Sequence, residues 1–120
     1  MRSMRGLTVV LAGAQPGRLR AALSLLAAQA ALGGRARLYL HEDAVGLLGG
    51  ALAGKSDAAH RAAGLPDLAT LLADARELGV EVQACQTGAA MAGVALDGLA
   101  EAGGLLSLLQ DLGDDRLVLA

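Results

Sequence analysis

The stretch 80-VEVQACQTG-88 predicts a short buried strand that ends at Cys85, the only cysteine of the chain. The small residues 88-GAAMAG-93 follow at once and predict the start of a helix. Backbone N–H groups and the dipole at a helix N-terminus favour a thiolate over a thiol. A thiol between a strand end and a helix start is therefore a candidate nucleophile.

Strand patterns and helix patterns alternate along the rest of the chain. Apolar runs predict strands over residues 7–12, 35–40, 80–84, 99–102 and 116–120, and periodic Leu and Ala predict helices over 16–32, 66–78, 88–96 and 104–112, with one or two helical turns within 44–53. This alternation is typical of βαβ units. We therefore expect a single domain over residues 1–120, an α/β fold with a flavodoxin-like, doubly wound, parallel five-stranded sheet in the order 2-1-3-4-5. The small polar segment 54–61 is expected to be a mobile loop.

The predicted strand order places the candidate thiol at a switch point of the sheet. The first and third strands are neighbours in that order, so the turn 13–17 and the turn 85–88 would face each other across a crevice, where ligands bind in such sheets. The expected pocket residues besides Cys85 are Gly13, Ala14, Gln15, Gln86, Thr87 and Gly88. The alternative is that Cys85 is a small hydrophobic residue in the core, as free cysteines often are.

His41 is the other residue that belongs to this candidate pocket, as a base for the thiol. In the assumed order, the first strand separates the second from the third, which puts His41 about 9.5 Å from Cys85. A direct hydrogen bond is then not expected, and a solvated histidine at a strand end is the favoured interpretation. His60 is expected on the surface, and Glu42 and Asp43 fit helix capping as well as catalysis.

The composition excludes several classes of protein. Hydrophobic residues make up 54% of the 120 residues, which suffices for a core, but Tyr39 is the only aromatic residue. A net charge of −2 without a basic cluster argues against nucleic-acid binding. No second cysteine exists for a disulfide or a cysteine-based zinc site, so a reducing, cytoplasmic compartment is expected.

Membrane and cofactor signals are weak. The longest uncharged apolar run, 21–34, is too short for a membrane span, and residues 1–14 fit a first strand better than a secretory signal. The segment 12-AGAQPGR-18 lacks the Gly-Lys-Ser/Thr of a P-loop and the hydroxyls that would hold a flavin phosphate. We therefore expect neither a cofactor nor a metal.

The predicted first helix has apolar residues on two sides. Leu19, Leu23, Leu26 and Ala30 form its main stripe, while Leu25 and Leu32 lie on nearly the opposite side. One sheet face cannot cover both sides, so the second side suggests a subunit interface.

With these features together, the sequence resembles the DsrE/DsrF-like family of small sulfur-relay proteins. The resemblance rests on residues 7–32 with 37-RLYLHEDAV-45, on 71-LLADARELGVEVQAC-85 with the QTGAAMAG that follows, and on 102-AGGLLSLLQDLGDDRLVLA-120. Only the Cys85 segment is specific, because the rest is general α/β patterning.

This resemblance implies a flavodoxin-like sheet without flavin and assembly into homotrimers or homohexamers. It also implies that Cys85 carries sulfur as a persulfide, taken from a donor protein and passed to an acceptor thiol. Some family members are described as peroxiredoxin-like, so a thiol peroxidase is a third hypothesis. A non-catalytic oligomeric binding or assembly module with a structural cysteine is the second.

Overall fold

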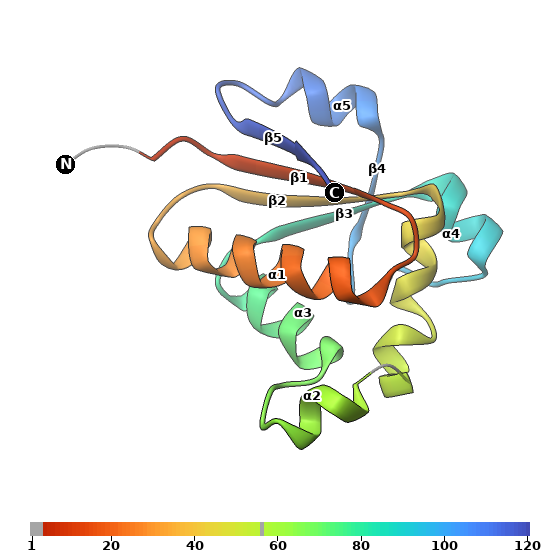
Figure 1. Cartoon of the computed structure of the whole chain (residues 1–120). Coiled ribbons are helices and arrows are strands. Elements are labelled where there is room, and N and C mark those ends of the chain that lie inside the picture. Colours follow the sequence, from red (N-terminus) through yellow and green to blue (C-terminus); the bar gives the residue numbers. More distant parts are fainter. Residues whose placement is uncertain (1–3, 56) are drawn as a thin grey trace.

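The computed structural model describes residues 4–55 and 57–120 and shows one five-stranded, all-parallel sheet. The strands are β1 (Leu7–Ala12), β2 (Ala36–His41), β3 (Glu81–Cys85), β4 (Glu101–Gly103) and β5 (Arg116–Leu119), in the spatial order β4-β3-β2-β1-β5. The flavodoxin-like α/β class expected from the alternating pattern is thus confirmed (Figure 1). Residues 1–3, at the start of the segment weighed as a secretory signal, and residue 56 of the expected loop lie outside the described residues.

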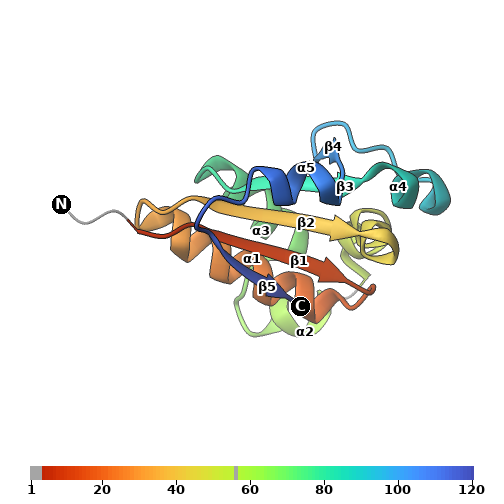
Figure 2. The ribbon, with the colours of Figure 1, turned by 90° about the horizontal axis from the view of Figure 1, so that it is seen from above.

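The expected strand order 2-1-3-4-5 is wrong. The chain steps from β1 to β2, β3 and β4 in one direction and then returns to place β5 on the free side of β1. Figure 2 shows these five strands side by side, with β4 and β5 at the two edges. The third strand therefore pairs with the second, Leu40 opposite Ala84, and β2 separates β3 from β1.

The helices cover the two faces of the sheet unequally. One face carries α1 (Pro16–Ala31) and α3 (Leu68–Glu77), while among the described residues only the short helix α5 (Leu105–Gln110) covers the other (Figure 1). Right-handed crossovers explain this arrangement. The connection from β4 to β5 runs across the sheet in the opposite direction to the earlier ones, so its helix, α5, must lie on the opposite face. The segment Glu42–Leu48, a 3₁₀ helix, and α4 (Gln86–Ala92) pack together at the carboxyl end of the strands.

Local sequence signals set the ends of these helices. Pro16 occupies the first position of α1, where its missing N–H removes no hydrogen bond. The Asp67 carboxylate accepts a 2.9 Å hydrogen bond from the Thr70 N–H and caps α3. The Thr70 side chain and then this N–H lower the pKa of Asp67. The expected loop 54–61 instead contains a short helix, α2 (Ala58–Ala62), next to a helical turn over Ala51–Lys55.

The sheet face under α1 and α3 forms the main core. Its side chains are aliphatic and come from alternate strand positions, among them Val9, Leu11, Leu38, Leu40 and Val82. The three leucines of the main stripe of α1 are buried there and Ala30 is partly buried, whereas Leu25 and Leu32 are exposed. The pattern of apolar residues on two sides of α1 is confirmed, and the interface inferred from it stays a prediction.

The sheet face under α5 holds a buried polar network in place of a continuous apolar core. Arg37 and Asp115 are 2% and 8% exposed, and Arg37 Nη2 lies 3.5 Å from Asp115 Oδ2. The Thr8 hydroxyl joins them: it accepts a 3.0 Å hydrogen bond from Arg37 Nε and donates one of 3.0 Å to Asp115. Leu108 of α5 packs beside this network on Val10 and Tyr39. Ion pairing thus fixes the C-terminal strand beneath α5.

Candidate functional site

Cys85 is the last residue of β3 and directly precedes α4. It is partly buried, and it packs both against the main core and against the small cluster formed by Val10, Tyr39 and Leu108 on the α5 face. Strand alternation explains its orientation, since Val82 and Ala84 point into the main core and Cys85 must point the other way. The thiol therefore lies at the carboxyl end of the sheet, between a strand end and a helix start, as the sequence predicts.

One hydrogen bond reaches the sulfur, and several nearby groups act on the pKa of the thiol. The Gly88 N–H donates to Cys85 Sγ over 3.4 Å, so that Cys85 itself is the N-cap of α4. This bond is the main cause that lowers the pKa of Cys85 below its ordinary value; burial opposes it, and the backbone N–H of Glu42, the Tyr39 hydroxyl and the backbone N–H of Thr87 add to it. The surroundings of Cys85 consequently favour the thiolate.

Tyr39 connects the thiol to the interior of the sheet. Its side chain is 2% exposed, on the same face of β2 as Arg37. Burial, and then the negative charge and the hydrogen bond of Cys85, raise the pKa of Tyr39 to about 12. The phenol thus stays protonated at neutral pH and can donate its hydrogen to the sulfur.

The turn after β2 supports the other side of the thiol. Glu42 has φ = 47°, a left-handed conformation found at no other described residue that is not glycine. Its backbone lies against Gly88, where an added Cβ would come within 2.7 Å of the Glu42 carbonyl oxygen. Close contact between Glu42 and Gly88 therefore holds two of the sulfur's donors together.

His41 lies nearer to Cys85 in the sheet than the sequence suggested. The separation by two strand spacings is wrong, because β2 and β3 are neighbours. His41 Nε2 lies 3.0 Å from Glu42 Oε1, and the Tyr39 and His41 rings are 6.2 Å apart between centroids. His41 Nδ1 is buried without a hydrogen-bond partner among the described residues. The imidazole is thus oriented by Glu42, and it makes no hydrogen bond to Cys85 within the described part of the chain.

The expected crevice between the turns 13–17 and 85–88 is also wrong, because the end of β2 lies between them. Instead, a cavity of about 350 Å³ lies between Ala14 of the first turn and Gly88 of the second, with Glu42 and Asp43 between them. Met91 and Ala92 complete its lining. Of the other expected pocket residues, Gly13, Gln15, Gln86 and Thr87 are exposed beside this region and do not line the cavity. The cavity passes next to the turn that supports the thiol.

Sequence reasoning missed Tyr39 and the backbone of Glu42. Both follow from the pairing of β2 with β3, which brings Tyr39 opposite Gln83, two residues before Cys85. The one signal in the sequence is that the only aromatic residue of the chain precedes His41 by two positions in a strand, and so shares its face.

Two further searches gave negative results for the described residues 4–55 and 57–120. No group of three or more His, Cys, Asp or Glu side chains is placed to hold a metal ion. No helix in that part of the chain has the length and apolar character needed to cross a bilayer.

Comparison with known proteins adds no assignment to this geometry. No family model matches the chain, and a search of curated proteins finds none with significant sequence similarity.

The Tyr39→Phe variant tests the part that the phenol has in the site. It removes only the hydroxyl, so we expect the pKa of Cys85 to rise and alkylation by iodoacetamide near neutral pH to slow by a fewfold. Thiolate absorbance and alkylation rate, each followed against pH, measure this. Val10→Ala, a change in the same cluster that carries no donor, serves as the control. An unchanged titration in Tyr39→Phe would show that the phenol does not act on the sulfur.

Proposed function

We propose that the protein is a sulfur carrier that holds persulfide sulfur on Cys85 and passes it to a thiol of a partner protein. The observation that carries the proposal is the position of Cys85 as the N-cap of α4, where the Gly88 N–H donates to its sulfur and the surroundings lower the pKa of the thiol. This environment stabilises a thiolate, which is the nucleophile in sulfur exchange. The resemblance of the Cys85 segment to the DsrE/DsrF-like family supports sulfur as the cargo.

Loading needs no oxidant. The Cys85 thiolate attacks the terminal sulfur of a donor persulfide, a new S–S bond forms, and the donor's own S–S bond breaks. The donor leaves as a thiolate and takes up the proton that the terminal sulfur carried. Cys85 is then a persulfide.

Unloading reverses the same exchange. A thiolate of the acceptor attacks the outer sulfur, and Cys85 leaves as a thiolate. The surroundings that lower the pKa of Cys85 stabilise this leaving group, because a thiol of lower pKa leaves faster. The chain has no second cysteine, so the persulfide cannot close to an internal disulfide. A reducing, cytoplasmic compartment, where such a thiol persists, suits this chemistry.

Mass spectrometry tests the proposal directly. Protein incubated with a small-molecule persulfide is expected to gain the mass of one sulfur atom at Cys85 and to lose it when a low-molecular-weight thiol is added. Cys85→Ser, which keeps the size of the side chain, is expected to gain nothing. If Cys85 stays unmodified while a free-cysteine peptide in the same tube is loaded, the carrier function is refuted.

A non-catalytic assembly module is the second candidate function. The packing of Cys85 against Val10, Tyr39 and Leu108 favours it, because such packing is also that of a structural cysteine. Alkylation of the native protein distinguishes the two. An inert Cys85 that reacts only after unfolding supports the module, and rapid reaction supports the carrier.

We also propose that the protein is a homo-oligomer whose contacts lie on the α5 face of the sheet. Parallel sheets are ordinarily covered on both faces, and here α5 alone covers one of them (Figure 1). Large apolar side chains are exposed on α5 and, by strand alternation, on that side of β5: Leu106, Leu109, Leu117 and Leu119. The trimer or hexamer that the family resemblance implies would cover these residues.

Charge substitution in this patch tests the assembly. Leu106→Glu and Leu119→Glu are expected to convert the oligomer to a monomer in light scattering after size exclusion, since each places a carboxylate in an apolar contact. Leu65→Glu changes a similarly exposed leucine elsewhere and is expected to leave the mass unchanged. A wild-type protein that is monomeric at high concentration contradicts the proposal.

A further inference from the structure

The imidazole of His41 has one paired and one unpaired nitrogen. Nε2 lies 3.0 Å from Glu42 Oε1, whereas Nδ1 is buried without a hydrogen-bond partner among the described residues. A buried nitrogen without a partner costs free energy, and such groups are rare in folded proteins unless they take part in chemistry. The unpaired nitrogen therefore points to a partner that arrives with a substrate.

The sheet places His41 beside Cys85. Leu40 of β2 lies opposite Ala84 of β3, and His41 and Cys85 are the next residues of these two strands. Opposite residues of neighbouring parallel strands point to the same face, and the strands lie about 4.8 Å apart. The distance of 6.2 Å between the ring centroids of Tyr39 and His41 agrees with a shared face. His41 and Cys85 therefore lie side by side at the carboxyl end of the sheet.

Glu42 determines which nitrogen of the imidazole can accept a proton. Its carboxylate accepts the hydrogen bond of the Nε2–H, so in the neutral ring the hydrogen stays on Nε2 and Nδ1 keeps its lone pair. The Glu42 side chain is 65% exposed, whereas Nδ1 is buried. The imidazole thus joins the interior to the surface, in the arrangement of a general base that a carboxylate orients.

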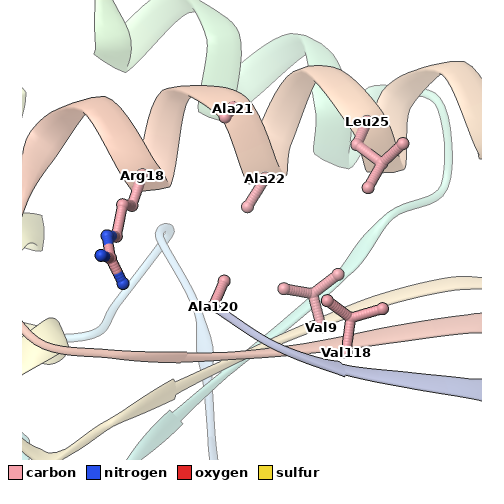
Figure 3. Close-up of a pocket in the computed structure, with 7 residues that line it drawn as sticks. All are labelled: Val9, Arg18, Ala21, Ala22, Leu25, Val118 and Ala120. Carbon is pink, nitrogen blue, oxygen red and sulfur yellow. The ribbon is translucent and has the colours of Figure 1, made fainter.

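The other groups around the thiol are poorly suited to take up a proton at neutral pH. Tyr39 stays protonated, because its pKa is raised to about 12, and β1, α4 and α5 contain no titratable side chain. On the opposite face, the groove between α1 and the strands β1 and β5 is lined by apolar side chains and Arg18 (Figure 3), and arginine is not a base. Glu42 and Asp43 are exposed on the turn that follows β2. His41 is thus the base that the fold places next to the thiol.

We propose that His41 is the acid–base residue of sulfur exchange at Cys85, where it moves the proton of the incoming sulfur group. The inference rests on the proposed carrier function and supplies the proton step that this function needs. Exchange between a persulfide anion and a thiolate brings two negative charges together. Proton transfer through a neutral imidazole avoids this repulsion.

The proton moves in both directions of the exchange. In loading, the Cys85 thiolate attacks the terminal sulfur of a hydropersulfide, and the donor's S–S bond breaks. Nδ1 of His41 takes the proton of the terminal sulfur, and the imidazolium then returns a proton to the departing thiolate. In unloading, Nδ1 takes the proton of the acceptor thiol, and the imidazolium protonates the outer sulfur before Cys85 leaves. The proton belongs to the substrate, so His41 needs no hydrogen bond to Cys85 Sγ in the free protein.

Rates of loading and of alkylation, measured on the full chain, test the role of His41. With glutathione hydropersulfide as the probe, His41→Gln is expected to load Cys85 about 100-fold more slowly than the wild type at neutral pH. Alkylation by iodoacetamide well above the pKa of the thiol uses the thiolate alone and is expected to change by less than about twofold. His60→Gln changes the other histidine of the chain, on α2, and is expected to alter neither rate.

Two further variants separate proton transfer from structure, and urea unfolding verifies that each is folded. His41→Ala is expected to load as slowly as His41→Gln and to recover by at least about tenfold when imidazole is added, because the free base replaces the side chain. Glu42→Gln keeps the shape of the side chain but removes the carboxylate that orients the ring. It is expected to slow loading by about three- to tenfold.

The inference and the carrier function fail in different ways. A wild-type loading rate in His41→Gln would overturn the inference and leave the carrier function intact. Equal slowing of loading and alkylation, without recovery in imidazole, would also overturn it, because His41 would then act on packing or on the ionisation of the thiol. Wild-type protein that is alkylated rapidly at Cys85 but gains no sulfur refutes the carrier function and the inference together.

Discussion

Replacing Asp115 with alanine is expected to lower the free energy of unfolding by about 3 kcal/mol, because it leaves Arg37 buried without its main counter-charge. The Thr8 hydroxyl loses its acceptor at the same time. Asp111 lies 3.5 Å from Arg37 Nη1 and offsets part of the loss, which puts the effect at the lower end of the range for broken buried pairs. Urea unfolding followed by circular dichroism measures the change.

Asp111→Ala is the matched control for this prediction. Asp111 binds both Arg35 and Arg37, but its side chain is 75% exposed, so water replaces much of what is lost. We expect it to cost less than about 1 kcal/mol. Equal losses in the two variants would mean that burial of the Arg37–Asp115 pair does not govern the stability of this region.

Replacing Gly88 with alanine is expected to damage both the fold and the candidate site. The new Cβ would lie 2.7 Å from the Glu42 carbonyl oxygen and 2.9 Å from Val45 Cγ2, so the start of α4 must move. We expect a loss of about 1–3 kcal/mol in stability. Since the Gly88 N–H is the main donor to Cys85, its displacement is also expected to raise the pKa of the thiol.

Gly17→Ala is the control for Gly88→Ala. An added Cβ at Gly17 meets no atom within 4 Å, and the position is helical, so stability is expected to stay the same or to rise by up to about 1 kcal/mol. Urea unfolding and the thiolate absorbance against pH give both readouts. A Gly88→Ala protein with unchanged stability and unchanged thiol titration would contradict the close contact with Glu42.

The lowered pKa of Cys85 also links stability to pH. Because the folded protein holds the thiolate more favourably than the unfolded chain does, the stabilisation is fully present above the unfolded pKa and is lost as the pH falls through the folded pKa. In Gly88→Ala this dependence is expected to be smaller, since the main donor is displaced.

The sequence predicted the elements of the fold better than their arrangement. Periodic leucines in residues 66–78 and the apolar runs at 7–12 and 80–84 marked α3, β1 and β3 to within two residues, because such patterns are local. Strand order depends instead on contacts between distant residues. The Thr8–Arg37–Asp115 network joins β1, β2 and the start of the last strand, and no local pattern in the chain indicates it.

The same limit applied to the candidate site. Cys85 was predicted at a strand end because its neighbours in the sequence show this. The contribution of Tyr39 and of the Glu42 N–H depends on β2 lying beside β3, and the assumed order placed β1 there. The same wrong strand order led to the expectation that His41 lies two strand spacings from Cys85.

The position of β5 has a consequence for how the protein folds. β5 pairs only with β1, so Leu7 must find Arg116 at the far end of the chain, whereas β1, β2 and β3 each pair with the next strand in sequence. Closing so long a loop costs more chain entropy than pairing neighbouring strands, so this pairing is expected to form slowly. The four-stranded part can assemble first, and α5 and β5 dock last. Until they do, Tyr39 and the face of the sheet around Cys85 stand open to solvent, which makes this late step the one that encloses the thiol.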